Sequence, residues 1–533
     1  MSKNEETSRE IYNNRPSPSN VDWRKITGCV IFFLSILCSL VLFNNCGEES
    51  EDPVSDDTTN ATDDSTDDDA NTVLDADGDD VADADDTCTN TPSGEIVDEN
   101  GCSDSQKDSD SDGVTDDLDN CPETTSGKTV NSNGCSNDAH IYPNVLLIIA
   151  DDLGNDMLAG FNEYEINPLT PTLDSLRASG ISFTNVWSSP ICSPTRAGLI
   201  SGQYGFRTGV LNAGDRLDES TPSIQQKINE EIPETYVHGI IGKWHLSGQP
   251  TIMDHPYSLG LDYFAGVIGG SVGSYYEYPL IVNNVRNKSY VYATEQFTNL
   301  ASNWIETQAQ PWFLWLTHVA PHTPYEVPPE GTYNQSDVSD PLGMYLASIE
   351  SLDYYINQLI IGMDQKTKEN TLFIFIGDNG TDNDILRGYS ASHGKGTLYE
   401  GGVRVPLIIS GSHVNRKNAT DTSMIQSLDL TSLILDYIGI SDTFEDSQSF
   451  LPLLNSPGTH REYLYSESVN RKNSVYAVKN LTHKLLVKNE NEEFYDLQKN
   501  LLENENLLDN ELTDLQQTNY EALKSYVFDL KNE

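Results

Sequence analysis

The chain has 533 residues, and 83 acidic against 31 basic residues give it a formal net charge of −52. This excess of negative charge excludes a general nucleic-acid-binding protein, because no broad basic face can neutralise phosphates. Hydrophobic residues make up 37% of the chain. That value is below the roughly 45–50% of an average globular domain, so we expect part of the chain to lack a packed core.

Residues 26–43 form an uncharged, mostly apolar run that follows Arg24 and Lys25. Basic residues before such a run are typical of an export signal or a membrane anchor. Cys46 follows shortly after, where a bacterial lipoprotein is cleaved and acylated. Three interpretations stay open: a lipoprotein anchored at Cys46, an uncleaved signal anchor and a cleavable secretory signal. Each predicts an exported chain, in the bacterial periplasm or at the cell surface, and the first two make the membrane its partner.

The next segment is acidic and repeated. Residues 47–140 hold 30 acidic and two basic residues. Residues 47–73 have no period and predict a disordered spacer. From there a 33-residue period relates Cys88 to Cys121 and Cys102 to Cys135, which indicates a tandem duplication. Carboxylates at alternate positions with a nearby glycine suit a hard cation such as Ca²⁺. The predicted ligands are Asp75, Asp77, Asp79, Asp83 and Asp86 in the first copy and Asp108, Asp110, Asp112, Asp116 and Asp119 in the second.

The duplicated segment resembles thrombospondin type-3 repeats, in which Ca²⁺ and paired cysteines rigidify a chain with almost no apolar core. The resemblance implies disulfides between Cys88 and Cys102 and between Cys121 and Cys135. The first copy departs from the pattern at Gly78, which moves the glycine. The alternative is a solvated acidic spacer that binds no stoichiometric metal.

From Pro143 onward the composition is globular, and four apolar runs lead into polar residues. They are residues 144–150 before Asp151 and Asp152, residues 237–241 before Lys243 and His245, residues 312–317 before His318, and residues 371–376 before Asp378 and Asn379. Such runs read as strands buried on both faces, and helical stretches separate them. We therefore predict an α/β fold with a large, mainly parallel mixed sheet flanked by helices. Ligands bind at the carboxyl ends of such strands.

These clusters predict two kinds of group at one edge of the sheet. Asp151, Asp152, Asp378 and Asn379 offer oxygen ligands of the kind that Ca²⁺ or Mg²⁺ prefers. Cys192 is the one cysteine after residue 135, and Pro194 suits the first turn of a helix that begins there. A helix N-terminus and Arg196 together favour an anion.

The motif Cys192-Ser-Pro-Thr-Arg196, followed by Ala197 to Gly202, closely resembles the signature of the type I sulfatases of the alkaline phosphatase superfamily. Five further motifs follow the family's order: Asp151-Asp152, residues 242–246, residues 320–322, residues 378–380 and residues 394–406. Ser247 replaces the glycine usual in the family. The resemblance covers about residue 143 to the C-terminus.

The resemblance implies that Cys192 is oxidised to formylglycine by a formylglycine-generating enzyme. One oxygen of the aldehyde hydrate attacks sulfur and displaces the alcohol, and deprotonation of the other then releases sulfate. It implies that Asp151, Asp152, Asp378, Asn379 and the hydrate of residue 192 bind Ca²⁺, with Asp378 as a possible base. Arg196 and Lys243 would hold the hydrate and sulfate, His245 would take the proton that triggers sulfate release, and His322 and Lys395 would face the leaving oxygen. No motif position assigns a role to His318.

The predicted organisation is an N-terminal tail (1–25), an export or anchor segment (26–46), a linker (47–73), two calcium repeats (74–138), a sulfatase catalytic domain (142–440) and an α+β subdomain (441–533). In the last, residues 474–478, 483–487 and 493–497 read as strands and residues 512–530 as a helix. Tyr463, Tyr465 and Arg471 are weak candidates for contact with substrate.

The leading prediction is an exported sulfuric ester hydrolase, a sulfatase acting on sulfated carbohydrate. The alternatives are a phosphonate or phosphodiester hydrolase with the same site, and a Ca²⁺-dependent surface protein with an inactive sulfatase domain. Specificity would reside in loops 275–287 and 326–341, where Tyr275, Tyr276 and Tyr278 would stack on sugar rings or fill the loop core.

Overall fold

The computed structural model describes residues 74–119, 121–122, 124, 126–127, 130, 134, 142–249, 251–441, 444–470 and 473–532. The predicted anchor, Cys46, the linker, Cys135 and Arg471 lie outside these residues. The chain divides into two compact units, of which one ends at Asp108 and takes in Thr115–Asp117, and the other contains Ser109–Val114 and the chain from Leu118 on. None of the described helices is long and apolar enough to cross a bilayer.

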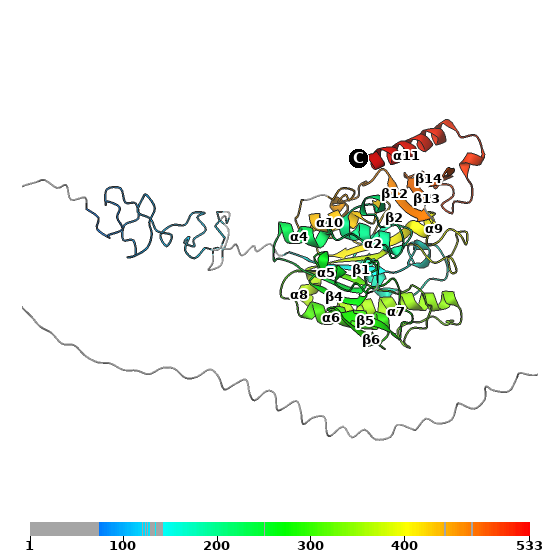
Figure 1. Cartoon of the computed structure of the whole chain (residues 1–533), viewed down its shortest axis with the longest axis horizontal. Coiled ribbons are helices and arrows are strands. Elements are labelled where there is room, and N and C mark those ends of the chain that lie inside the picture. Colours follow the sequence, from blue (N-terminus) through cyan, green and yellow to red (C-terminus); the bar gives the residue numbers. More distant parts are fainter. Residues whose placement is uncertain are drawn as a thin grey trace, which may run out of the picture. The chain divides into compact units, whose positions relative to one another are not determined.

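The larger unit is built on a mixed sheet (Figure 1). Within the described residues it contains eleven strands. In spatial order they are β10 (Ala419–Asp421), β2 (Gly180–Trp187), β9 (Arg404–Gly411), β8 (Thr371–Gly377), β1 (Asn144–Ala150), β7 (Trp312–Thr317), β3 (Val237–Lys243), β4 (Tyr263–Val267), β5 (Tyr278–Val282) and β6 (Val285–Ser289), with β11 (Ile425–Gln426) also on β2. Strands β8, β1, β7, β3 and β4 are parallel neighbours, while β9, β5 and β6 pair antiparallel. The predicted mainly parallel α/β fold is confirmed.

Helices cover both faces of this sheet (Figure 1). Val145, Leu147 and Ile149 of β1 belong to the core shared with α2 (Cys192–Ser201), α4 (Ile224–Glu231) and α10 (Asp429–Tyr437). The alternate residues of β1 pack in the opposite core with α1 (Pro171–Ala178), α6 (Ala293–Glu306) and α7 (Pro341–Gly362). Every residue of β1 is buried, which is why the run is apolar throughout and does not alternate.

Shorter helices and a second sheet complete this unit. The short helices are α3 (Gly205–Thr208), α5 (His255–Ser258), α8 (Gln365–Glu369) and α9 (Glu400–Val403). The second sheet is antiparallel, in the order β12 (Leu464–Asn470), β13 (Asn473–Lys479), β14 (His483–Lys488) and β15 (Asn491–Asp496). One face packs against the final helix α11 (Asp514–Asn532) through Leu523, Val527 and Leu530. The other face packs against Trp187 at the end of β2 and against Leu398 and Val403. The predicted C-terminal α+β subdomain is therefore present, while its boundary at residue 441 stays a prediction.

The acidic repeat has a repeated hydrogen-bond pattern to match its repeated sequence. In the first copy the Thr91 N–H donates to Asp77 Oδ2 (2.8 Å) and the Cys88 N–H to Asp86 Oδ1 (2.8 Å). Thirty-three residues later, the Thr124 N–H donates to Asp110 Oδ2 (2.6 Å) and the Cys121 N–H to Asp119 Oδ1 (2.7 Å). The structure thus shows the duplication independently of the residue identities.

One predicted disulfide is confirmed, and the pairing in the other stays a prediction. Cys88 and Cys102 are bonded, as the resemblance implied. Cys121 is also disulfide-bonded, and its predicted partner lies outside the described residues. In the first copy, carboxylate oxygens of Asp75, Asp77 and Asp79 lie within 4.8 Å of one another. That these aspartates bind calcium stays a prediction.

Candidate active site

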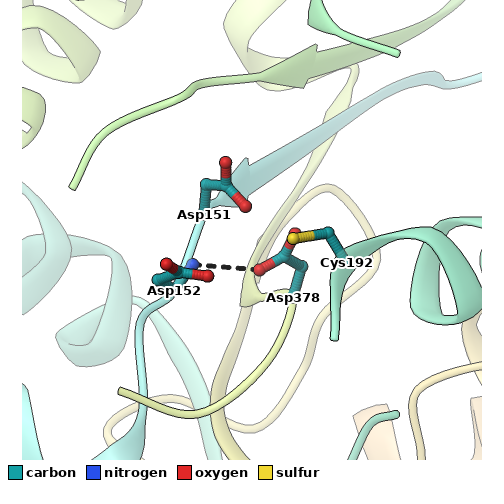
Figure 2. Close-up of side chains that lie close together, drawn as sticks. All are labelled: Asp151, Asp152, Cys192 and Asp378. Atoms are coloured by element: carbon teal, nitrogen blue, oxygen red, sulfur yellow. Dashed lines mark hydrogen bonds between the residues drawn. The ribbon is translucent and has the colours of Figure 1, made fainter. Parts of the chain in front are cut away.

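The carboxyl ends of β1 and β8 bring three aspartates together. Ala150 and Gly377 are register partners at the ends of these strands, so Asp151 and Asp378 leave the sheet side by side. Asp152 follows in the left-handed region at φ 67°, and its N–H donates to Asp378 Oδ1 (3.0 Å; Figure 2). All three side chains are at most 1% exposed.

Cys192 approaches these carboxylates from another element. It is the first residue of α2, and its side chain is buried (Figure 2). Its Sγ and one oxygen from each of Asp151, Asp152 and Asp378 lie within 4.8 Å of one another. Burial, reinforced by Asp151, raises the pKa of the Cys192 thiol well above its usual range. The helix start predicted from Pro194 is confirmed.

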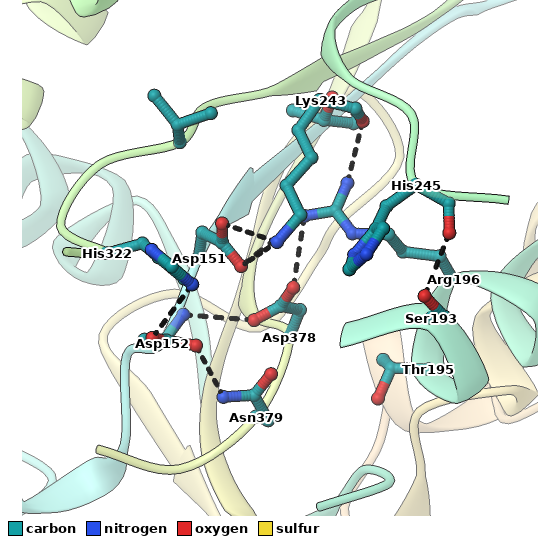
Figure 3. A network of polar contacts seen from close by, with 12 residues as sticks. Asp151, Asp152, Ser193, Thr195, Arg196, Lys243, His245, His322, Asp378 and Asn379 are labelled. Carbon is teal, nitrogen blue, oxygen red and sulfur yellow. Dashed lines mark hydrogen bonds and ion pairs between the residues drawn. The ribbon is translucent and has the colours of Figure 1, made fainter. Parts of the chain in front are cut away.

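Buried cations surround the carboxylates (Figure 3). Lys243 Nζ donates to both oxygens of Asp151 (2.8 and 2.7 Å). Arg196 donates through Nη2 to Asp378 Oδ2 (3.0 Å) and through Nη1 to the Lys243 carbonyl (2.8 Å). Although burial opposes its ionisation, Lys243 holds the pKa of Asp151 well below its usual range. Burial and Asp151 raise the pKa of Asp378 to about 7.

Two further predicted residues lie close to Asp152, and they come from separate loops. Lys395 Nζ donates to Asp152 Oδ2 (2.6 Å), and His322 Nε2 lies 3.6 Å from the same oxygen. The side chains of Lys395 and His322 are 19% and 15% exposed, whereas the three aspartates are at most 1% exposed. Lys395 and His322 therefore form the solvent side of the cluster.

His245 lies beside Ser193, at the start of α2 (Figure 3). Its backbone is left-handed at φ 63°, and its carbonyl accepts from Ser193 Oγ (2.8 Å). A Cβ added to Gly270 would lie 2.4 Å from His245 Nε2, so the glycine gives the ring its space. Burial, with Lys243 next, lowers the pKa of His245 to about 3, which keeps the imidazole neutral.

The acidic cluster fits a divalent cation. Asn379 Nδ2 donates to Asp152 Oδ1 (2.8 Å), while Asn379 Oδ1 is buried without a hydrogen-bond partner. The buried carboxylates of Asp151, Asp152 and Asp378 converge, and buried like charges destabilise one another unless cations compensate them. All donors are oxygens, apart from the cysteine sulfur, as Ca²⁺ or Mg²⁺ requires.

Hydrogen bonds that no sequence motif predicted hold this arrangement. Tyr275 O–H donates to the carbonyls of Val319 (2.8 Å) and His322 (2.7 Å). Tyr345 O–H donates to the Asp152 carbonyl (2.6 Å). Ser193 also accepts from the Gly214 N–H (2.9 Å). No motif spacing could reveal these contacts, because each joins loops or helices far apart in the sequence.

The predicted specificity loops are tied together. Glu326 Oε2 accepts from the Tyr275 N–H (2.6 Å) and from Ser274 Oγ (3.1 Å). Tyr275 and Tyr278 are only 2% and 1% exposed, whereas Tyr276 is 37% exposed. Of the two alternatives left open for these tyrosines, Tyr275 and Tyr278 fill the loop core, and only Tyr276 presents surface.

The weaker candidates lie elsewhere. His318 is fully buried, and neither ring nitrogen has a hydrogen-bond partner. Tyr465 is fully buried and donates to Glu467 Oε2 (3.0 Å). Tyr463 stacks on Tyr526 with ring centroids 4.6 Å apart. Tyr465 and Tyr463 therefore make these contacts with other residues of the C-terminal subdomain.

Comparison with known proteins identifies the family of this chain. The sequence model of the sulfatase family matches residues 143–440, and one described as N-sulphoglucosamine sulphohydrolase, C-terminal, matches residues 389–529. The chain belongs to the sulfatase family.

Curated relatives and solved structures agree with this assignment. Arylsulfatase G of Rattus norvegicus is 27% identical over 56% of this chain and 65% of its own length. Arylsulfatase J of Mus musculus is 29% identical over 54% of this chain and 51% of its own. The chain thus spans about half to two thirds of the length of these relatives. The fold matches that of Ps i-CgsB, solved with k-i-k-neocarrahexaose, with a TM-score of 0.62 and 23% identity over 73% of this chain and 92% of that one.

Proposed function

We propose that this chain is an exported sulfuric ester hydrolase that acts on sulfated carbohydrate. One observation carries the proposal: the cysteine of the sulfatase motif lies at the start of α2 with its sulfur among three buried aspartates, and Lys243, Arg196 and Lys395 pair with those aspartates. The arrangement suits an anionic group, since cations and a helix N-terminus converge on it. A named carbohydrate complex of a protein with the same fold supports the substrate class.

A divalent cation, which we propose to be Ca²⁺, would be held by Asp151, Asp152, Asp378 and Asn379. When bound, it supplies positive charge that neutralises sulfate oxygens and acidifies a nearby hydroxyl. Formylglycine at position 192, made by a formylglycine-generating enzyme, would supply an aldehyde, which no encoded side chain offers. Its hydrate would carry the nucleophilic hydroxyl and a second hydroxyl whose deprotonation releases sulfate.

The chain's own residues would then divide the remaining tasks. Arg196 and Lys243 orient the anion and hold Asp378 and Asp151 in place. Neutral His245 accepts the proton whose removal releases sulfate. Lys395 and His322, on the solvent side, face the oxygen of the departing alcohol, where His322 donates a proton and Lys395 stabilises negative charge.

We also propose that residues 26–46 anchor the protein outside the cytoplasm and that the acidic repeats bind Ca²⁺. The disulfide between Cys88 and Cys102 supports an oxidising compartment. The convergence of Asp75, Asp77 and Asp79 supports the cation in the first repeat.

The test combines mass spectrometry with turnover. In protein from its native host, the peptide that contains Cys192 should show the loss of mass expected for replacing a thiol by an aldehyde. The same preparation should hydrolyse sulfate esters faster than matched phosphate and phosphonate esters, and Cys192→Ala should abolish turnover. A fully converted enzyme that prefers phosphate or phosphonate esters would establish the alternative hydrolase. An unconverted, inactive protein would favour the Ca²⁺-dependent binding alternative.

A further inference from the structure

A cavity of about 160 Å³ lies where the second sheet meets β2 and β9, and its lining contains none of the predicted catalytic or active-site metal-binding residues. Two cationic side chains line it, Arg404 and Lys479, together with Thr184, Asn185, Thr422, Asn480 and three leucines. Leu481 and Leu501 of this lining are exposed, so the cavity borders solvent. Its lining contains no carboxylate.

Lys479 forms the inner wall. It is 3% exposed, and its Nζ lies 2.7 Å from Asn185 Oδ1 and 3.4 Å from Glu400 Oε2. Behind it, Glu400 also accepts from Lys484 Nζ (3.3 Å) and from Trp187 Nε1 (3.0 Å). The carboxylate nearest the cavity is therefore shared among three donors.

Arg404 is the second cation that lines the cavity, and it donates hydrogen bonds to a backbone carbonyl. Its Nε and Nη2 both donate to the Thr184 carbonyl (2.9 and 2.7 Å). Among the described residues, no carboxylate makes an ion pair with it. Asp421, which lies near this edge of the sheet, is engaged by Arg416 (2.6 Å).

The charged cluster around the cavity, in which Arg404 is half-buried and the other members are buried, is therefore short of negative charge. It contains the cations Arg404, Lys479 and Lys484 but only the carboxylates Glu400 and Glu503, and Glu503 is engaged by Lys484 (2.7 Å). Burial, with Glu400 next, raises the pKa of Glu503 to about 7, which lowers its negative charge further. Buried charge without a counter-charge is costly, and the cavity beside Arg404 and Lys479 has room for an anion.

We propose that the Arg404–Lys479 cavity binds a small oxyanion of the size of sulfate. Cavities of roughly this volume, about 150 Å³, hold a benzene molecule, so sulfate fits. Asn185, Thr184 and Thr422 add polar groups beside the two cations. The occupant is either the free ion or a sulfate group carried by a saccharide chain, and the shared chemistry is the tetrahedral oxyanion.

The test introduces a carboxylate into the cavity. Thr422 is exposed and lines the cavity, and Thr420, two residues away, is exposed and does not. Isothermal titration of the full chain with sodium sulfate, against sodium chloride of equal ionic strength, should detect cavity binding in addition to any binding at the active site. Thr422→Asp should weaken cavity binding by more than about tenfold through like-charge repulsion, while Thr420→Asp, with the same added charge, should not.

A second variant tests directly whether the cations at the cavity lack a compensating carboxylate. Asn185→Asp places a carboxylate beside Lys479 without changing side-chain size. It should raise the melting temperature in chloride and abolish the part of the sulfate response that Thr422→Asp removes. A lower melting temperature together with unchanged sulfate binding would contradict this shortage of negative charge.

A sulfated polysaccharide distinguishes the two sources. If inorganic sulfate shows no cavity binding but Thr422→Asp weakens binding of the polysaccharide relative to Thr420→Asp, a saccharide sulfate group is the occupant. If the two variants bind both probes alike, the proposal is wrong, whatever the outcome for activity.

Discussion

At the residue scale, the active site is a balance of buried charges in which each carboxylate has its own cation. Asp151 is held by Lys243, Asp378 by Arg196 and Asp152 by Lys395. Removing one partner from a buried pair leaves the other charge uncompensated, which costs more than the pair contributes when intact. Substitution of any of these cations should therefore affect both folding and turnover.

Lys243→Met gives the clearest test of this balance. Because Asp151 would lose both of its hydrogen bonds from Nζ, we expect the free energy of unfolding to fall by about 3–5 kcal/mol. Turnover should fall by about 10²–10³-fold. Chemical denaturation and sulfate release measure the two effects. Lys227→Met, which removes a cation paired with Glu231 on the surface, is the control and should leave turnover unchanged.

His318 provides a pH-dependent prediction. Burial lowers its pKa to about 3, while the unfolded chain titrates near the ordinary value of about 6.5. The unfolded state therefore binds more protons between these values, and stability falls as pH drops below about 6.5. The contribution of this residue is complete above that pH. Denaturation at pH 7 and pH 5 should show a smaller difference in His318→Leu than in the parent, and an equal difference would contradict the prediction.

At the scale of elements, a buried charge network joins the second sheet to the segments that carry the active site. Lys484 of β14 contacts Glu400 of α9 and Glu503, and Lys479 and Lys484 lie over the Trp187 ring at the end of β2, 4.8 and 4.7 Å from its centroid. Trp187 precedes the Cys192 segment and Glu400 follows the Lys395 loop. The Gly396 N–H also donates to the Pro190 carbonyl (2.8 Å), so the two segments are held together.

Lys484→Met should therefore affect turnover from a distance. We expect it to destabilise the fold by about 3–5 kcal/mol, because Glu503 would lose its buried partner. We also expect kcat to fall, since the Cys192 and Lys395 segments would shift relative to the bound ester. The matched control is Lys488→Met, on the same strand, whose pair with Glu493 is partly exposed and contributes at most about 1 kcal/mol. Equal effects of the two substitutions on kcat would contradict the role of the network.

At the scale of the whole molecule, every residue of the candidate active site lies after Tyr142, and so do the four hydrophobic cores of the described chain. The acidic repeats have a structure of their own, fixed by backbone hydrogen bonds to carboxylates and by disulfides. Their composition leaves little apolar surface to bury, so disulfide cross-links take over part of the stabilising role of a core.

A chain truncated to begin at Tyr142 should retain the turnover of the full protein. A calcium chelator should lower the melting temperature of both forms, because the proposed active-site cation would bind the folded state and so stabilise it. Calorimetry and sulfate release with and without chelator measure these effects. Loss of turnover on truncation alone would show that the repeats support catalysis.

The polar cluster and the sheet that carries it were predictable from the sequence because both have local signals. Asp151 and Asp378 directly follow fully apolar runs, and such runs end at one edge of a parallel sheet. The Cys192 motif marked the start of α2 through Pro194. The edge strands β5 and β6 were not predicted, because β6 is largely exposed and carries no clear apolar pattern.

The sequence by itself determined the class of fold, the family and the chemical groups of the site, since these depend on periodicity and on motifs within short segments. Only the tertiary structure decided that Tyr275 supports the His322 loop, that Tyr278 fills the core and that His318 lies without hydrogen-bond partners. It alone revealed the Glu400 network and the cationic cavity. The physical reason is that burial and charge balance depend on contacts between segments far apart in the chain. The residues next to a side chain in the sequence do not indicate which distant residue it will contact.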